Sequence, residues 1–192
     1  MRGEETLCVG LTELGLLKGP AALLTLGSHW KAVRIDELDR IASSLTSMSG
    51  ELIHAAQTQT ILASAVPREK PASIDRQWME AGMEEQRRSG LPRALFCVRL
   101  LEQKSDSTPD QRLSFLAGAF IASDLDALIE KGALSSGHPL VITGGGALAQ
   151  AWQHALSQAS IPAMVLSEFE VERGMLAGLR SIVEKGSAKY GR

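Results

Sequence analysis

LVITGGG, at residues 140–146, is the most informative segment of the chain. Its apolar and β-branched residues predict a short strand, and the residues from Ala147 onward predict an amphipathic helix. Glycines let the backbone approach a ligand closely, and free N–H groups at a helix start favour anions. Gly144, Gly145 and Gly146 therefore form either a nucleotide- or phosphate-binding turn or a tight strand-to-helix turn without a ligand. Because the glycines are contiguous, the segment is not the Gly-Xaa-Gly-Xaa-Xaa-Gly fingerprint of dinucleotide-binding proteins.

Length and composition favour one globular domain. The chain has 192 residues, of which 44% are hydrophobic and 22% are charged, enough for a sizeable core. Its net charge of −2 gives no electrostatic reason to expect nucleic acid or an anionic membrane surface as a partner. We find no apolar stretch long enough for a bilayer span and no signal-peptide pattern. Cys8 and Cys97 make neither a disulfide framework nor a zinc site, so we expect a cytoplasmic protein without a protein-bound metal.

The hydrophobic pattern predicts an α/β fold. Strands are expected at 22–28 and 30–36, with a turn at Gly27-Ser28-His29, then a weaker one at 41–48 and a short one at 163–166. Helices are expected from 50 to the prolines at 67 and 71, from a cap at Ser73 to Gly90, from Thr108 to Gly132, from 147, and from about Glu170. Residues 91–104 fit either a helix or a buried strand. Three strands followed by helices that alternate with parallel strands predict one lobe with a mixed sheet at 1–185, and a flexible tail at 186–192.

Two short polar segments near the start of the chain carry candidate site residues. Arg2 can hold a carboxylate, and Glu4 and Glu5 can bind hydroxyls or magnesium-bound water, although a solvated terminal segment is the simpler interpretation. The turn Gly27-Ser28-His29 and the following Lys31 offer a hydroxyl, an imidazole and an ammonium group that together suit phosphoryl oxygens. The alternative is a plain hairpin with an exposed lysine.

A third polar segment, Ser47-Met48-Ser49-Gly50-Glu51, places hydroxyls and a carboxylate at the entrance of a helix. A capped helix with an acidic first turn accounts for this pattern without a ligand. The remaining histidines are scattered without metal-ligand spacing. The sequence alone therefore indicates no nucleophile–histidine–acid arrangement.

Six segments, in this order, resemble landmarks of the 2-dehydro-3-deoxygalactonokinases. They are MRGEET at 1–6, LGSHWK at 26–31, MSGEL at 48–52, LFCVR at 95–99, LSFLAG at 113–118 and GMLAGLRSI at 174–182. The resemblance covers nearly the whole chain. It implies the superfamily of sugar kinases, actin and heat-shock-cognate proteins, whose members have two ribonuclease-H-like lobes with ATP and sugar in the cleft between them.

The chain resembles the C-terminal, ribonuclease-H-like lobe of these kinases. The Asp-Xaa-Gly-Xaa-Thr phosphate loop that the family carries on its N-terminal lobe is not found in residues 1–192. The family's Asp that precedes MRGEET, a candidate general base, is also outside this sequence. The resemblance therefore implies a half-kinase from a truncated or start-misassigned reading frame, inactive without the other lobe, and we expect it to form a homodimer through its exposed cleft face.

The resemblance also assigns roles to the candidate residues. It implies that Gly144, Gly145 and Gly146 lie against adenosine, and that Gly27, Ser28, His29 and Lys31 contact phosphate. It implies that Arg2, Glu4, Glu5, Gly50 and Glu51 hold the sugar acid or organise magnesium-bound water. The expected reaction is Mg²⁺-assisted phosphoryl transfer from ATP to a hydroxyl of 2-dehydro-3-deoxy-D-galactonate. The alternatives are a non-catalytic nucleotide-binding or regulatory lobe and a structural domain without a ligand.

Overall fold

The computed structural model describes residues 3–135, 137–144 and 146–190. Its elements are α1 (Glu4–Glu13), β1 (Ala21–Leu26), β2 (Trp30–Ile35), β3 (Ile41–Ser47), α2 (Ser49–Gln59), a 3-10 turn η1 (Ile61–Ser64), α3 (Arg76–Ser89), α4 (Leu91–Lys104), α5 (Pro109–Glu130), β4 (Leu140–Thr143), α6 (Ala147–Gln158), β5 (Ala163–Val165) and α7 (Glu168–Tyr190). The helix α7 thus continues beyond residue 185, where the sequence analysis placed the end of the lobe.

The strands form one mixed sheet in the order β3-β2-β1-β4-β5. The first three strands pair antiparallel, and β4 pairs in parallel with both β1 and β5. Parallel neighbours require long crossover connections, and helices supply them here. The predicted α/β class, the mixed sheet and the ribonuclease-H-like order of strands are confirmed.

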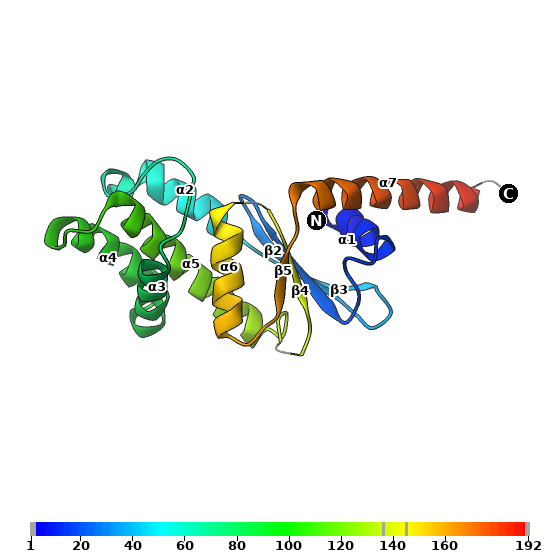
Figure 1. Ribbon diagram of the computed structural model, residues 1–192, viewed down its shortest axis with the longest axis horizontal. Coiled ribbons are helices and arrows are strands. Elements are labelled where there is room, and N and C mark those ends of the chain that lie inside the picture. Colours follow the sequence, from blue (N-terminus) through cyan, green and yellow to red (C-terminus); the bar gives the residue numbers. More distant parts are fainter. Residues whose placement is uncertain (1–2, 136, 145, 191–192) are drawn as a thin grey trace.

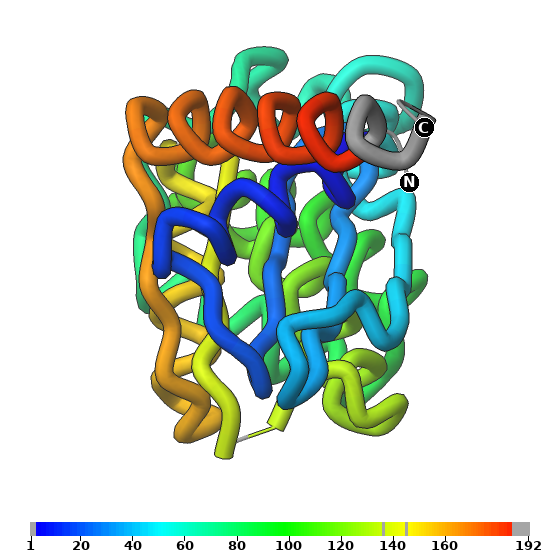
Figure 2. Tube along the Cα trace, turned by 90° about the vertical axis from the view of Figure 1, so that its right-hand side faces the viewer, coloured from blue at the N-terminus to red at the C-terminus, as the bar shows by residue number. Residues whose placement is uncertain are grey.

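Both faces of the sheet are covered by helices (Figure 1). Side chains alternate along each strand, so Leu24 and Ile142 join the larger core beneath α5 and α6, whereas Leu23 and Val141 face α1. Figures 1 and 2 show α1 and α7 together on this second face, with α7 running across one end of the strands. Because both faces are buried, β1 and β4 read as continuous apolar runs in the sequence.

The buried helix α5 is the centre of the larger core. It begins as predicted, because Thr108 and Gln111 form a capping box in which each side chain accepts a hydrogen bond from the other's backbone N–H. Glycines allow α3 and α5 to cross in backbone contact. A Cβ atom at Gly118 would lie 2.0 Å from the carbonyl oxygen of Met79, and one at Gly82 would lie 2.0 Å from that of Phe115.

Three expectations about local structure differ from the observed structure, and one open alternative is decided. The cap of α3 is Asp75, which accepts a hydrogen bond from the Trp78 N–H, and not Ser73. The helix expected to reach Pro67 ends at Gln59, and η1 follows it. Residues 91–104 form a helix, which resolves that ambiguity. Residues 4–13 also form a helix, so Glu4 and Glu5 belong to a folded element rather than to a solvated end.

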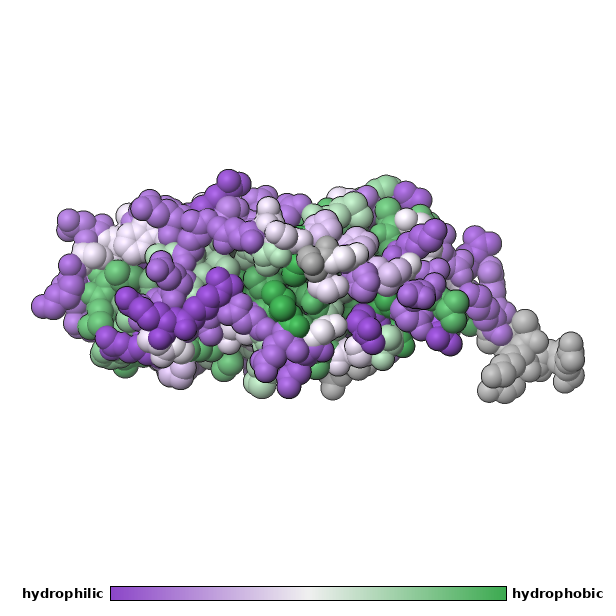
Figure 3. All heavy atoms as spheres, turned by 90° about the horizontal axis from the view of Figure 1, so that it is seen from below, coloured by the Kyte–Doolittle hydropathy of each residue, from purple (hydrophilic) through white to green (hydrophobic). Residues whose placement is uncertain are grey.

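On the face shown in Figure 3, hydrophilic side chains are interspersed with smaller apolar patches. The helices of the described ranges include no candidate for a membrane span.

We predict that Gly118→Ala lowers the free energy of unfolding by about 2–3 kcal/mol, because the new methyl group meets a backbone carbonyl that cannot move alone. Denaturant unfolding measures the change. Gly137→Ala is the matched control, since a Cβ atom there has nothing within 4 Å. Equal stability of the two variants would contradict the close crossing of α3 and α5.

Candidate functional site

Parallel pairing of β1 with β4 brings two distant segments to the same edge of the sheet. Thr25 lies opposite Thr143 in the register, so the turn after β1 and the glycines after β4 emerge side by side. Gly144 has a φ of +96°, and a Cβ atom there would lie 2.3 Å from the carbonyl oxygen of Leu26. The start of the glycine segment therefore lies directly against the start of the 27–29 turn, on the same side of the molecule.

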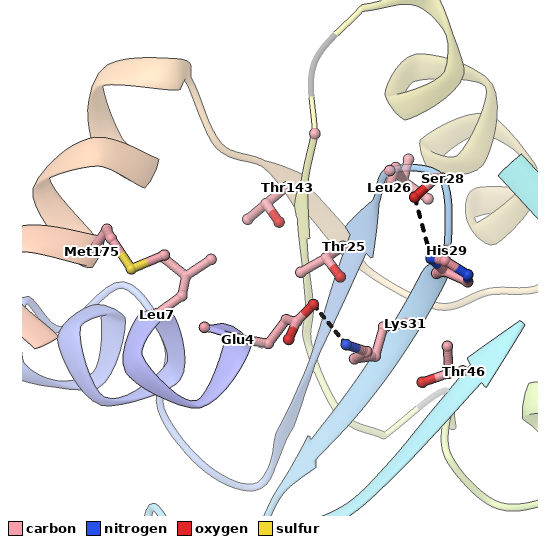
Figure 4. A pocket seen from close by; sticks show the side chains of 13 residues that line it. Glu4, Leu7, Thr25, Leu26, Ser28, His29, Lys31, Thr46, Thr143 and Met175 are labelled. Carbon is pink, nitrogen blue, oxygen red and sulfur yellow. Dashed lines mark hydrogen bonds and ion pairs between the residues drawn. The ribbon is translucent and has the colours of Figure 1, made fainter. Parts of the chain in front are cut away.

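A cavity of about 820 Å³ opens at this edge. Its lining comes from the ends of the strands, the segments that follow β1 and β4, the start of α1 and the first part of α7, and consists of Gly3, Glu4, Leu7, Thr25, Leu26, Gly27, Ser28, His29, Lys31, Thr46, Thr143, Gly144 and Met175. In Figure 4, Glu4 from α1 and Lys31 from β2 point toward each other, with Thr25 and Thr143 beside them and the 28–29 turn above. We call this space the first cavity.

Lys31 and Glu4 form an ion pair in the wall of the first cavity. Their Nζ and Oε1 atoms are 2.6 Å apart, and the two side chains are 11% and 21% exposed. Opposite charges that are partly withdrawn from water interact more strongly than pairs on the open surface. The pair therefore fixes an ammonium and a carboxylate next to the threonine hydroxyls, and both can bind a polar ligand.

The 27–29 turn rests on the start of α2. A Cβ atom at Gly50 would lie 2.1 Å from the carbonyl oxygen of Gly27, so only glycine fits this contact. The Glu51 N–H donates a hydrogen bond of 2.7 Å to the Ser28 carbonyl oxygen. His29 Nε2 lies 3.3 Å from Glu51 Oε2. The 27–29 turn and the start of α2 at Gly50 and Glu51, both predicted as candidate site segments, are therefore in direct contact.

A second cavity, of about 550 Å³, shares residues 26–29 with the first and extends over α2 to the start of α6. Gln57 is 4% exposed, and its amide group donates hydrogen bonds to the carbonyl oxygens of Pro67 (2.7 Å) and Glu69 (2.9 Å). These bonds hold the loop that brings Arg68 and Lys70 to the wall of the second cavity. The remaining lining residues are Trp30, Gly50, Glu51, Ile53, His54, Pro71 and Leu148.

The structure brings most of the predicted site residues together. Glu4, Gly27, Ser28, His29, Lys31 and Gly144 line the first cavity, and Gly50 and Glu51 line the second. Two residues are placed differently: the Glu5 carboxylate accepts a hydrogen bond from the Gly3 N–H, and Gly146 is the N-cap of α6. Neither residue is in the lining of the two cavities. Arg2 and Gly145 are outside the described residues.

Several lining residues had no signal in a linear reading of the sequence. Thr25, Thr46 and Thr143 meet only because three strands align their ends, and Arg68 and Lys70 only because Gln57 holds their loop. The register of a parallel pair between 22–26 and 140–143 is the signal that would have found Thr25 and Thr143. Among the described residues, no cluster of three or more histidine, cysteine, aspartate or glutamate side chains is arranged to hold a metal ion.

A comparison with protein families gives one match. The sequence model of the 2-keto-3-deoxy-galactonokinase family matches residues 1–182. The chain belongs to this family. The match confirms the resemblance, because 2-keto and 2-dehydro are two names for the same oxo group of the sugar acid.

Solved structures give the same fold. A protein from Sinorhizobium meliloti, assigned as a 2-dehydro-3-deoxygalactonokinase, is similar with a TM-score of 0.78 and 26% identity over 95% of this chain and 59% of that chain. This family member is therefore considerably longer than the chain described here. The activator of 2-hydroxyisocaproyl-CoA dehydratase from Clostridium difficile, solved with bound ADPNP, matches with a TM-score of 0.59 and 12% identity over 99% of this chain and 69% of that chain, which indicates the fold alone. A comparison with curated proteins finds no match.

Cys8 lies in α1, one turn after the Glu4 that faces the first cavity. The side chain is 2% exposed, and burial, followed by the nearby charges of Glu4 and Glu5, raises the pKa of its thiol from 9.0 to about 12. The thiolate is the reactive form of cysteine, so the folded protein holds Cys8 in its inert state at neutral pH.

We predict that Cys8, studied in a Cys97→Ala background, reacts with iodoacetamide at pH 8.5 only when the protein unfolds. The same shift makes the folded state bind the thiol proton more tightly than the unfolded state. This contribution to stability is complete below pH 9.0 and is lost as the pH rises toward about 12. Alkylation of the native protein at the rate of a free thiol would contradict the burial of Cys8 in the core between α1 and the sheet.

Proposed function

We propose that this chain forms the nucleotide- and substrate-binding wall of a kinase that phosphorylates 2-keto-3-deoxygalactonate with ATP. One observation carries the proposal: the parallel register of β1 and β4 sets Gly144, the 27–29 turn and Lys31 around one cavity. Family membership supports the substrate class and the phosphoryl donor.

In this proposal the 27–29 turn and Lys31 bind the phosphate chain. Gly27 adds no side chain, so a phosphate oxygen can approach the backbone, and Lys31 contributes a positive charge that is already partly withdrawn from water. Phosphoryl transfer is accelerated mainly by positioning and by neutralising charge, which suits such a wall. The nucleoside would occupy the second cavity, which shares this turn and reaches the start of α6.

The sugar acid would bind in the first cavity. Glu4 and the hydroxyls of Thr25 and Thr143 can accept hydrogen bonds from sugar hydroxyls. The Glu4 carboxylate and the threonine oxygens are also hard donors that suit Mg²⁺ through its bound water. Mg²⁺ would neutralise the phosphate charge, while the residues of this chain orient the two substrates.

The length of the family member from Sinorhizobium meliloti supports a further part of the proposal. The match covers 59% of that chain, so the whole kinase includes residues beyond those that match. We propose that the described residues bind nucleotide but transfer phosphate only when those additional residues complete the cleft. The open cleft wall is also the surface through which the homodimer predicted from the sequence would form.

We predict that the purified chain binds Mg·ATP, and that Lys31→Met weakens this binding about tenfold through loss of one charged contact. Isothermal titration calorimetry measures both. Lys104→Met, at the exposed end of α4, is the matched control and should bind as the original chain does.

A measurement of phosphorylation distinguishes the proposed kinase from a non-catalytic nucleotide-binding lobe. We expect no phosphorylation of 2-keto-3-deoxygalactonate by the chain alone, and phosphorylation when the remaining residues of the Sinorhizobium meliloti relative are supplied as a separate polypeptide. Nucleotide binding without turnover in that mixture would favour a non-catalytic nucleotide-binding lobe. Absence of binding in the original chain would contradict the proposed site.

A further inference from the structure

The junction between β3 and α2 supports the 27–29 turn from behind. β3 ends at Ser47 and α2 begins at Ser49. The next residue, Gly50, packs backbone to backbone against Gly27, and the Glu51 N–H donates to the Ser28 carbonyl oxygen at 2.7 Å. Any shift of this junction therefore moves the turn with it.

The start of α2 has no side-chain hydrogen bond from its N-cap residue. The N-cap residue is Met48, whose side chain makes no capping hydrogen bond. The hydroxyl groups on either side of it form a small polar cluster instead. Ser47 Oγ lies 3.1 Å from Ser49 Oγ and accepts a hydrogen bond of 3.4 Å from the Ser49 N–H.

The cluster is anchored on α5. The Ser47 hydroxyl donates a hydrogen bond to the Asp124 carboxylate, across 77 residues of sequence. Asp124 projects from the most buried helix of the larger core, so its backbone is held firmly. Burial raises the pKa of this carboxyl group, and the hydrogen bonds from Ser47 and Ser49 oppose that rise. A half-buried carboxylate in a mainly apolar wall needs such partners, and the junction supplies them.

We propose that Asp124 is a positioning residue for the phosphate-binding turn, acting through Ser47 and the start of α2 on Gly27 and Ser28. The inference rests on the proposed function for the statement that the turn binds phosphate. The structural part of the inference does not depend on the proposed function. Whether or not a nucleotide is bound, Asp124 holds the start of α2 where the Glu51 N–H donates its hydrogen bond to the Ser28 carbonyl oxygen.

The test compares five variants. Asp124→Ala and Ser47→Ala each remove one side of the same hydrogen bond, and the double variant removes both. Asp126→Ala is the matched control, because Asp126 lies on the same helix but pairs with Arg87 at the surface. Asp124→Asn keeps an oxygen that can accept from Ser47 and should restore the behaviour of the original chain.

Two readouts are needed. The first is hydrogen exchange of the Glu51 N–H, which we expect to be at least tenfold faster in Asp124→Ala and in Ser47→Ala, and unchanged in Asp126→Ala. The second is the dissociation constant for Mg·ATP, which we expect to rise about fivefold in each single variant. The double variant should weaken binding by much less than the product of the two single effects, because both changes break the same Ser47–Asp124 hydrogen bond.

The outcomes separate this inference from the proposed function. If Asp124→Ala does not fold, Ser47→Ala alone carries the test, since it leaves α5 intact. Unchanged Glu51 exchange in Ser47→Ala would overturn the inference even if nucleotide binds normally. Faster Glu51 exchange in a chain that binds no nucleotide would support the positional role of Asp124 and contradict the proposed function instead. If the losses of Mg·ATP affinity in the two single variants add up in full in the double variant, Asp124 and Ser47 act separately, and the inference is overturned.

Discussion

The parallel pairing of β1 with β4 is the constraint on which the site depends. It is a backbone interaction with a fixed register, and it sets Thr25 opposite Thr143 so that both strands end at one edge. The glycine segment and the 27–29 turn, more than 100 residues apart in the sequence, then meet without any side chain holding them. In open α/β sheets ligands bind at the carboxyl ends of parallel strands, and the first cavity opens at that edge here.

Close backbone contacts also fix the segments that follow β1 and β4 and the start of α2 relative to the sheet. Gly144 abuts Leu26, and Gly50 abuts the turn that follows it. Both contacts leave less than the space of a methyl group between backbones. The walls of the two cavities are therefore built from elements whose relative positions have little freedom, while the groups with charge and hydrogen-bonding capacity, Lys31, Glu4 and the threonines, project from them. Preorganised groups of this kind are what a phosphate-binding wall requires.

The sequence predicted the strands and the mixed sheet because these depend on local patterns, and it named several residues that the fold brings to the walls of the two cavities. Apolar runs identify buried strands, and the Thr108 capping box marks a helix without reference to the rest of the chain. The whole of α1 was missed because only four of its ten residues, Leu7, Cys8, Gly10 and Leu11, are buried, and they are buried where the sheet and α7 pack against the helix. β3 gave a weak signal because it is an exposed edge strand rich in serine.

Other parts of the site could not be read from the chain because they depend on tertiary contacts. Gly146 was grouped with Gly144, but the parallel register ends at Thr143; of these two described glycines, Gly144 lies against Leu26 and lines the first cavity, whereas Gly146 does neither. Asp124 lies in a helix whose pattern is otherwise that of a core element, and nothing near it in sequence marks its link to Ser47. Residues that act by position rather than by motif become visible only when the elements are packed.

Backbone-amide NMR during a titration with Mg²⁺ and a non-hydrolysable ATP analogue tests the central claim most directly. The account predicts one saturable transition, with its largest shift changes at the amides of 27–31 and 143–144 together. Shift changes confined to one of these segments, or gathered on the far helices α3 and α4, would contradict the view that the two strand ends form a single phosphate-binding site.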